Sequence, residues 1–233
     1  MSDALKFDVD AELFMMVRRA VGSEETRYYL QGVFIEPDPR GGAWLVATDG
    51  IIMMVARDAS AVAPKPAIIK LQLLEVPDEP DCECGAPVGG HDFTRKRLVF
   101  DLPEEGYAPA ILVTPGLWRQ SIGVIDPAPD AVKYPAWRKV WGDQYQCQPK
   151  HDAGGDAAKD VSVSVFHGGR LDRLIGGEAF QIIIPADHGP AVVLLNERAN
   201  VAGLIAPYQG KIKGQELLAE LRLAGTQAAA APA

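Results

Sequence analysis

The sequence predicts an α+β fold made of repeated β-α-β-β-β units. Two observations favour this class: β-rich runs separated by turn-forming residues fill most of the chain, and a short amphipathic helix follows a first strand in two places. The 233 residues are 48% apolar and 23% charged, which is typical of a globular protein that buries a core.

The first unit begins with a strand expected over residues 5–9, followed by a helix. Asp10 is a suitable N-cap. Apolar residues then recur with helical spacing up to the stop at Gly22, namely Leu13, Met16, Val17 and Ala20. Arg18 and Arg19 fall on the polar side of this helix.

Strands account for most of the remaining pattern. The first unit continues with strands expected over residues 27–36, 43–48 and 51–56, separated by turn formers. Further strands are expected over residues 67–71, 97–102, 110–114 and 121–125, with no clear second helix among them. The next unit contains a short helix over residues 170–175 and strands over residues 161–165, 179–185, 191–196 and 200–206. The tail from Gly214 has helical spacing and then an Ala-rich end.

Charge and composition exclude several classes. The net charge is −8, so any contact with DNA must come from a local basic face. Three cysteines form no even disulfide framework, and the N-terminus shows no apolar signal region, so we expect a cytoplasmic protein. No apolar run approaches the length of a membrane span.

Three groups of residues carry a family resemblance. Residues 26–33 (Thr-Arg-Tyr-Tyr-Leu-Gln-Gly-Val) are followed by residues 45–50 (Leu-Val-Ala-Thr-Asp-Gly), residues 134–140 read Tyr-Pro-Ala-Trp-Arg-Lys-Val, and Gly189–Val193 precedes Leu204–Tyr208. In this order they resemble the bacterial sliding clamp, the beta subunit of DNA polymerase III, in a truncated or phage-type form. The resemblance implies a DNA-clamp-like fold.

The resemblance also implies a domain organisation. Residues 1–142 are similar to the middle domain of the clamp, and residues 143–212 to the second half of its last domain, while residues 213–233 form a tail that is helical and then disordered. Family rings contain twelve β-α-β-β-β units, each of which is half of a domain. A chain with three such units would need four copies to complete a ring, and a chain with four units would need three copies. The resemblance therefore implies a homo-oligomer that could close into a ring.

Family clamps bind short partner peptides in an apolar cleft, and the resemblance places this cleft residue by residue. One wall is expected at Thr48, Gly50, Ile51, Ile52 and Met53, the linker at Val140 and Trp141, and the other wall at Leu204, Ala206 and Tyr208. The alternative is that the aliphatic residues among them belong to the hydrophobic core and have no binding role. Relatives usually have His-Arg-Leu where this chain has Ile51, Ile52 and Met53, so we expect a more apolar wall.

Four helix-borne arginines are the candidate DNA-binding residues: Arg18, Arg19, Arg170 and Arg173. A protein that slides on duplex DNA needs diffuse positive charge facing the phosphates, because hydrogen bonds to base edges would arrest sliding. The alternative is that these arginines form the solvated faces of two amphipathic helices.

The acidic loop over residues 75–91 contains Cys82, Cys84 and His91. These residues could contribute to a zinc site, but the C-x-C spacing with one histidine is unlike the usual paired ligands. Free thiols on a solvated loop explain the same pattern, and we expect no metal and no cofactor.

The sequence contains no catalytic signature: its four histidines are scattered, and there is no nucleophile motif or phosphate-binding glycine loop. We therefore expect a non-enzymatic processivity or scaffold protein of replication or repair. Its expected partners are duplex DNA, bound weakly and without sequence preference, and a peptide of a DNA polymerase or repair protein. The alternative is a non-encircling protein-interaction module that does not hold DNA.

Overall fold

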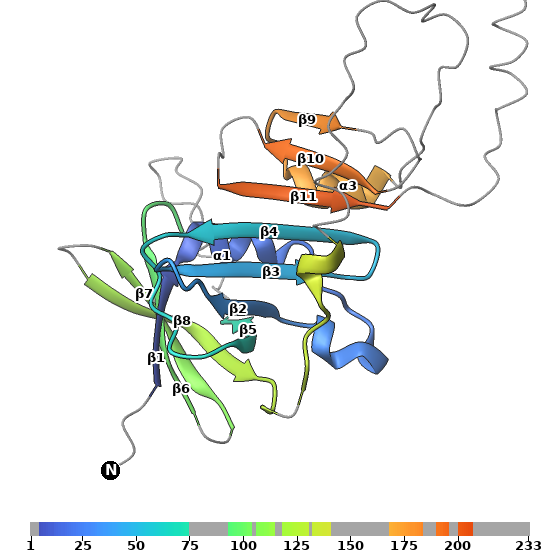
Figure 1. The fold of residues 1–233 in the computed structure, drawn as a ribbon. Helices are drawn as coiled ribbons and strands as arrows, with labels where there is room; N and C mark the ends of the chain where they lie inside the picture. Colours follow the sequence, from blue (N-terminus) through green and yellow to red (C-terminus); the bar gives the residue numbers. More distant parts are fainter. Residues whose placement is uncertain are drawn as a thin grey trace, which may run out of the picture.

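The computed structural model describes residues 5–74, 93–103, 106–114, 118–130, 132–140, 168–183, 190–195 and 200–206. These residues form one antiparallel sheet with the strand order β1-β6-β7-β8-β5-β2-β3-β4-β11-β10-β9 (Figure 1). The strands are β1 (Leu5–Asp10), β2 (Val33–Pro37), β3 (Ala43–Thr48), β4 (Ile52–Asp58), β5 (Ala67–Leu73), β6 (Arg97–Leu102), β7 (Ala108–Thr114), β8 (Trp118–Pro127), β9 (Phe180–Ile183), β10 (Ala191–Leu195) and β11 (Val201–Ile205). The helices include α1 (Ala11–Arg18), α3 (Gly168–Ile175) and the 3-10 helix η1 (Glu25–Leu30), and residues 137–140 are also helical. The α+β prediction is confirmed.

Helix α1 forms where the sequence predicts it. The Asp10 carboxylate accepts a hydrogen bond from the Leu13 amide at 2.9 Å, which satisfies one of the free donors at the helix start. Phe14 and Val17 are completely buried against the strands, so the apolar side of the helix lies on the sheet. Arg18 is the last residue of the helix and Arg19 is its C-cap; both are partly buried, although the sequence predicts them on the polar side.

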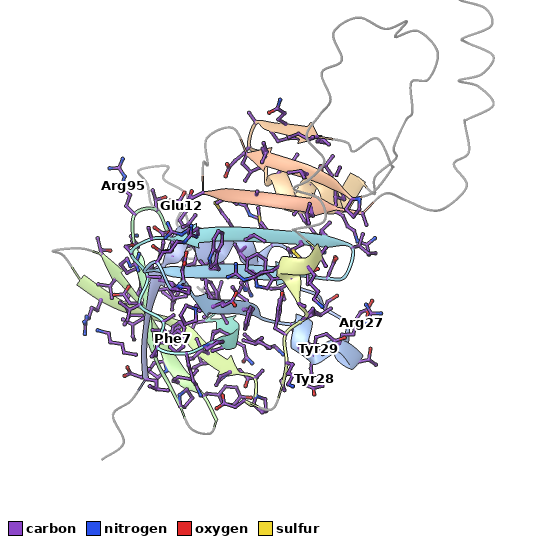
Figure 2. The ribbon with its side chains drawn as sticks, viewed as in Figure 1. Phe7, Glu12, Arg27, Tyr28, Tyr29 and Arg95 are labelled. Atoms are coloured by element: carbon purple, nitrogen blue, oxygen red, sulfur yellow. The ribbon has the colours of Figure 1, made fainter. Side chains whose placement is uncertain are left out.

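The prediction of a strand over residues 27–36 is wrong for its first residues. Residues 25–30 form η1 instead, and β2 begins only at Val33. Tyr28 and Tyr29 meet in a T-shaped arrangement with ring centres 6.0 Å apart (Figure 2). Aromatic residues favour strands mainly through packing against neighbouring strands, and β3 and β5 pair only with the part of the chain from Val33 onward.

The first eight strands contain an internal repeat. One unit consists of β1 to β4 and the other of β5 to β8. The first strand of each unit pairs with the second strand of the other unit: β1 pairs with β6, and β5 pairs with β2. After β4, Val62 forms two backbone hydrogen bonds with Asp8 of β1, at 3.0 and 2.8 Å, which connects the two ends of this eight-stranded group. The predicted repeat of strands is therefore present, whereas residues 75–92, between β5 and β6, lie outside the described residues.

An ion-pair network holds this closure together. The Arg97 guanidinium contacts a carboxylate oxygen of Asp8 at 2.6 Å and one of Asp58 at 3.1 Å. The same Asp58 oxygen accepts the backbone amide of Asp10 at 2.7 Å. Because Asp58 is buried, these partners compensate for the loss of hydration of its charge. The network joins β1, β4 and β6.

The third unit continues the same sheet. Strand β11 pairs with β4, from Val201 opposite Ala56 to Ile205 opposite Ile52. Helix α3 packs against β4 and β11, and its Leu174 is completely buried in the same core as α1. The sheet thus runs from the segment predicted as residues 1–142 into the segment predicted as residues 143–212; the boundaries themselves stay a prediction.

The helices of the described residues are short. Neither α1 nor α3, nor any other helix in the described ranges, combines the length and the hydropathy needed to cross a membrane.

The turn before β3 offers a matched test of the fold. Gly42 has φ +80°, and a Cβ there would collide with the Asp58 carbonyl oxygen and lie 2.7 Å from the Ala59 Cα. Its neighbour Gly41 has φ +94°, but a Cβ at that position would meet no other atom within 4 Å. We expect Gly42→Ala to lower the free energy of unfolding by about 3 kcal/mol and Gly41→Ala by only about 1 kcal/mol. Urea unfolding of both variants measures the difference, and equal losses would contradict the packing at Gly42.

Candidate functional site

The loop between β3 and β4 is a tight turn built from its own side chains. The Thr48 hydroxyl donates to the Ile52 carbonyl at 2.6 Å and accepts the Gly50 amide at 3.0 Å. One Asp49 carboxylate oxygen accepts the amides of Ile51 and Ile52 at 2.9 and 2.8 Å. Gly50 has φ +91°, a conformation that glycine adopts without strain. The Thr-Asp-Gly sequence therefore determines this turn locally, and the second Asp49 oxygen is left for other partners.

The structure brings the two predicted cleft walls together as neighbouring strands. Met53 lies opposite Leu204, Ile52 lies opposite Ile205, and the Ala206 amide donates to the Ile51 carbonyl at 2.8 Å. The contact is therefore direct strand pairing between β4 and the end of β11.

The side chains of these wall residues are distributed over two faces of the sheet. Met53 and Leu204 are only 6% and 3% exposed and share a buried cluster with Trp137. Ile52 is buried in the main core below α1, and Thr48 is buried in the turn. Three of the residues are exposed at the surface: Gly50, Ile51 (39% exposed) and Val140 (45% exposed). Ala206 is half-buried. Trp141 and Tyr208 lie outside the described residues.

Residues 132–140 form a strap that covers the buried cluster. Tyr134 stacks on Phe34 with ring centres 4.6 Å apart, and burial raises the pKa of its hydroxyl. The Trp137 indole donates to the Glu36 carboxylate at 3.0 Å, and the Arg138 guanidinium lies 4.4 Å from the Trp137 ring centre. The aromatic-Pro-x-aromatic-Arg motif thus has a structural role, because it closes the apolar face of β3, β4 and β11.

Two of the candidate DNA-binding arginines attach α3 to the rest of the protein. The Arg173 guanidinium donates to the carbonyls of Arg19 at 2.9 Å and Val21 at 2.8 Å. It also contacts the free Asp49 oxygen at 3.2 Å, while Arg170 reaches the same oxygen at 3.5 Å. These partners lie more than a hundred residues away along the chain, so the sequence carries no local signal for them.

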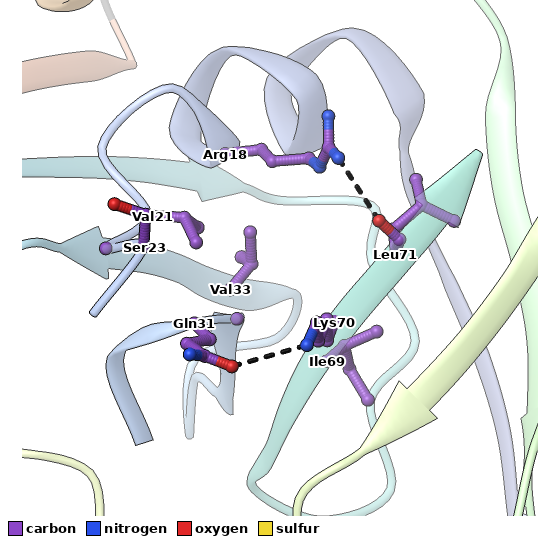
Figure 3. Close-up of a pocket in the computed structure, with 10 residues that line it drawn as sticks. Arg18, Val21, Ser23, Gln31, Val33, Ile69, Lys70 and Leu71 are labelled. Carbon is purple, nitrogen blue, oxygen red and sulfur yellow. Dashed lines mark hydrogen bonds between the residues drawn. The ribbon is translucent and has the colours of Figure 1, made fainter. Parts of the chain in front are cut away.

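The other two arginines lie at the end of α1. Arg18 donates to the Leu71 carbonyl of β5 at 3.2 Å, and burial lowers the pKa of its guanidinium. The Arg19 side chain packs against Gly176, where a Cβ would collide with it. Arg19, Arg170 and Arg173 therefore form one group around the end of α1, and Arg18 lines an adjoining depression together with Lys70 (Figure 3).

Lys70 is a candidate that the sequence analysis missed. It is exposed on β5 between two buried residues, and its amino group contacts the Gln31 side-chain oxygen at 3.3 Å. Alternation along the strand predicts that Lys70 points away from the core, but only the fold brings it into one depression with Arg18.

The described residues contain no group of three His, Cys, Asp or Glu side chains that could hold a metal ion. Cys82, Cys84 and His91 lie outside them, so the zinc alternative is not addressed by this arrangement.

Comparison with known proteins identifies the fold. No model of a known protein family matches the chain, and no curated protein matches its sequence. Among solved structures, DNA polymerase III subunit beta from Borrelia burgdorferi, in complex with a natural product, matches with a TM-score of 0.57 at 12% identity over 91% of this chain and 65% of its own. The DnaN sliding clamp from Bartonella birtlesii, bound to griselimycin, matches with a TM-score of 0.52 at 15% identity over 88% of this chain and 66% of its own. The ligand-bound sliding clamp from Pseudomonas aeruginosa matches with a TM-score of 0.52 at 14% identity over 90% and 68% of the respective chains.

These matches define the class of architecture: the chain has the fold of DNA sliding clamps, as predicted. It spans about two thirds of the length of the clamp chains that it matches. At 12 to 15% identity the similarity establishes the fold.

The two oxygens of Asp49 allow the turn and the attachment of α3 to be tested separately. Asp49→Asn keeps an oxygen for the Ile51 and Ile52 amides but removes the charge facing Arg170 and Arg173. We expect this variant to lose about 1 kcal/mol of unfolding free energy, and Asp49→Ala, which also loses the turn, about 2 kcal/mol or more. Urea unfolding at low and high salt measures both. A stability of Asp49→Asn equal to wild type at low salt would show that the ion pairs contribute nothing.

Proposed function

We propose that the chain is a non-enzymatic, sliding-clamp-like processivity or scaffold protein of replication or repair, which binds duplex DNA loosely and partner peptides near the β4–β11 junction. The main support is the combination of the clamp fold with basic residues on the helices. Helices α1 and α3 pack into the same core and carry Arg18, Arg19, Arg170 and Arg173, although the net charge is −8.

The arrangement of these arginines suits weak, sequence-independent binding. Arg170 and Arg173 remain partly exposed, but their guanidinium groups are held by Asp49 and by backbone carbonyls. Such side chains add positive potential without extending toward base edges. Affinity should therefore depend on phosphate contacts and fall steeply with salt.

The DNA prediction uses the double variant Arg18→Ala/Arg19→Ala. Removing two phosphate-facing cations should weaken duplex binding and reduce the log-log salt slope by roughly 2. The measurement is fluorescence anisotropy of a labelled duplex over a salt series. Lys133→Ala/Lys139→Ala is the matched control, because it removes the same charge from exposed positions on the strap. Unchanged DNA retention in the Arg18 and Arg19 variant would reject the DNA-facing role.

A second function is favoured by the contacts of the same arginines. Arg18 bonds to Leu71, and Arg173 to Arg19 and Val21, so part of their hydrogen-bonding capacity serves the fold. A non-encircling interaction module would need only this structural role. Peptide binding without any salt-sensitive DNA binding would support that alternative, and the mass of the chain in solution would show whether several chains associate.

For partner peptides we propose the surface around Ile51, Gly50, Ala206 and Val140, at the junction of β4 and β11. Ile51 is exposed although it is aliphatic, and its carbonyl receives the Ala206 amide. Ile51 and Val140 are both exposed aliphatic side chains, which suit the hydrophobic anchor of a short peptide. Trp141 and Tyr208 stay part of the proposed cleft as a prediction from the resemblance.

The peptide prediction separates surface from core. Ile51→Ala should weaken binding of a labelled peptide with a Gln and a C-terminal Leu-Phe pair by about tenfold, or 1.4 kcal/mol, without changing the melting temperature. Met53→Ala should instead destabilise the protein by about 2 kcal/mol or more, because it leaves a cavity beneath Trp137.

Val62→Ala is the control for that experiment, since it removes an exposed aliphatic side chain beyond the other end of β4. A titration in which Ile51→Ala and Val62→Ala bind equally well would place the peptide site elsewhere.

A further inference from the structure

A depression of about 530 Å³ lies between the end of α1, the segment around η1 and strand β5 (Figure 3). It adjoins the Asp49 group, since Gly22 and Ser23 also line the hollow around Asp49, Arg170 and Arg173. Ten residues line it, contributed by these three parts of the fold: Arg18, Val21, Gly22, Ser23, Gln31, Gly32, Val33, Ile69, Lys70 and Leu71.

The charge of this depression is unlike that of the chain as a whole. Its lining contains two cations, Arg18 and Lys70, and no Asp or Glu, whereas the whole chain has 31 acidic and 23 basic residues. Two positive charges that share a concave surface without a carboxylate attract an anion more strongly than cations scattered on a convex surface.

Six of the ten lining residues are aliphatic residues or glycines, and the depression exposes polar and apolar surface in nearly equal amounts, but its two most exposed residues, Ser23 and Lys70, are polar. Val33 and Ile69 are completely buried and Leu71 is only 4% exposed, so they offer little apolar side-chain surface to a ligand. What remains accessible includes the Ser23 hydroxyl, the Gln31 amide and the two cationic groups. These polar groups suit a ligand rich in hydrogen-bond acceptors.

Arg18 is held in place for such a contact. Its Nη2 donates to the Leu71 carbonyl at 3.2 Å, which leaves other guanidinium N–H groups for a ligand. Burial of the side chain lowers its pKa, which reflects a guanidinium that has lost part of its hydration. On the facing strand, the Lys70 amino group has one long contact to Gln31, at 3.3 Å, and can turn toward an anion.

We propose that this depression binds a phosphate group, with Arg18 and Lys70 as its charged ligands and Gln31 and Ser23 as neutral donors. A phosphate presents several acceptor oxygens and accepts charge-assisted hydrogen bonds from guanidinium and ammonium groups together. Under the proposed function, the phosphate group would belong to the backbone of a nucleic acid, and to that extent the inference rests on the proposed function. A free phosphorylated molecule is the other source.

The test uses Lys70→Gln in the full chain, because Lys70 is exposed and its one side-chain hydrogen bond among the described residues is the long contact to Gln31. The first probe is pyrophosphate, whose binding is measured by isothermal titration calorimetry. The second is a labelled DNA duplex, whose binding is measured by fluorescence anisotropy. We expect Lys70→Gln to weaken both by about tenfold, the loss typical of one charge-assisted contact. Lys139→Gln, which removes an exposed lysine from the strap, should change neither.

A second variant adds a charge without removing a cation. Ser23→Glu places a carboxylate at an exposed position of the lining and should weaken pyrophosphate binding at low salt, with an unchanged melting temperature. Pyrophosphate binding that depends on Lys70 in a protein that does not bind DNA would support the site and reject the proposed DNA function. DNA binding that is equal in Lys70→Gln and Lys139→Gln, together with no pyrophosphate binding by wild type, would overturn the phosphate site and leave the proposed function intact.

Discussion

The pairing of β4 with β11 is the interaction on which the rest of this arrangement depends. Five residue pairs join strands that are about 150 positions apart in the sequence, from Ala56 with Val201 to Ile52 with Ile205. This pairing places the Thr48–Met53 turn beside the end of β11 and brings α3 next to α1. It also buries Met53 and Leu204 together under Trp137. Without it, the strap would cover an incomplete apolar face and Asp49 would have no arginine partners from α3.

Asp49 couples the local turn to this long-range contact. One carboxylate oxygen fixes the backbone of the turn, and the other neutralises part of the charge of Arg170 and Arg173. Arg173 further satisfies two carbonyls beyond the end of α1, where helix geometry leaves acceptors without partners. The same side chains thus stabilise the junction and determine how much positive potential it presents. A structural role and a weak DNA-facing role are compatible, because diffuse electrostatic attraction does not require free side chains.

The candidate sites differ in the kind of surface that they offer. At the β4–β11 junction, side chains alternate between faces, so Ile52 and Met53 contribute to two cores and only Ile51 of the three is exposed. This surface is small and aliphatic. The depression beside Arg18 includes side-chain donors from Arg18, Ser23, Gln31 and Lys70, and its lining contains no Asp or Glu. An apolar anchor and a phosphate would therefore be recognised at different places, the first by burial of aliphatic surface and the second by charge-assisted hydrogen bonds.

Local patterns in the sequence determined the elements and their order. The strand bounds predicted for residues 43–48 and 97–102 are those of β3 and β6, and Asp10 caps α1 as expected, because alternation and capping depend on residues a few positions apart. The Thr-Asp-Gly turn could be predicted for the same reason. Only the tertiary structure decided that residues 25–30 form a 3-10 helix, that Leu204 covers Met53, that Arg173 binds the carbonyls of Arg19 and Val21, and that Lys70 faces Arg18 across a depression. These relations join distant parts of the chain, and they arise from strand pairing and burial that no periodicity within one segment encodes.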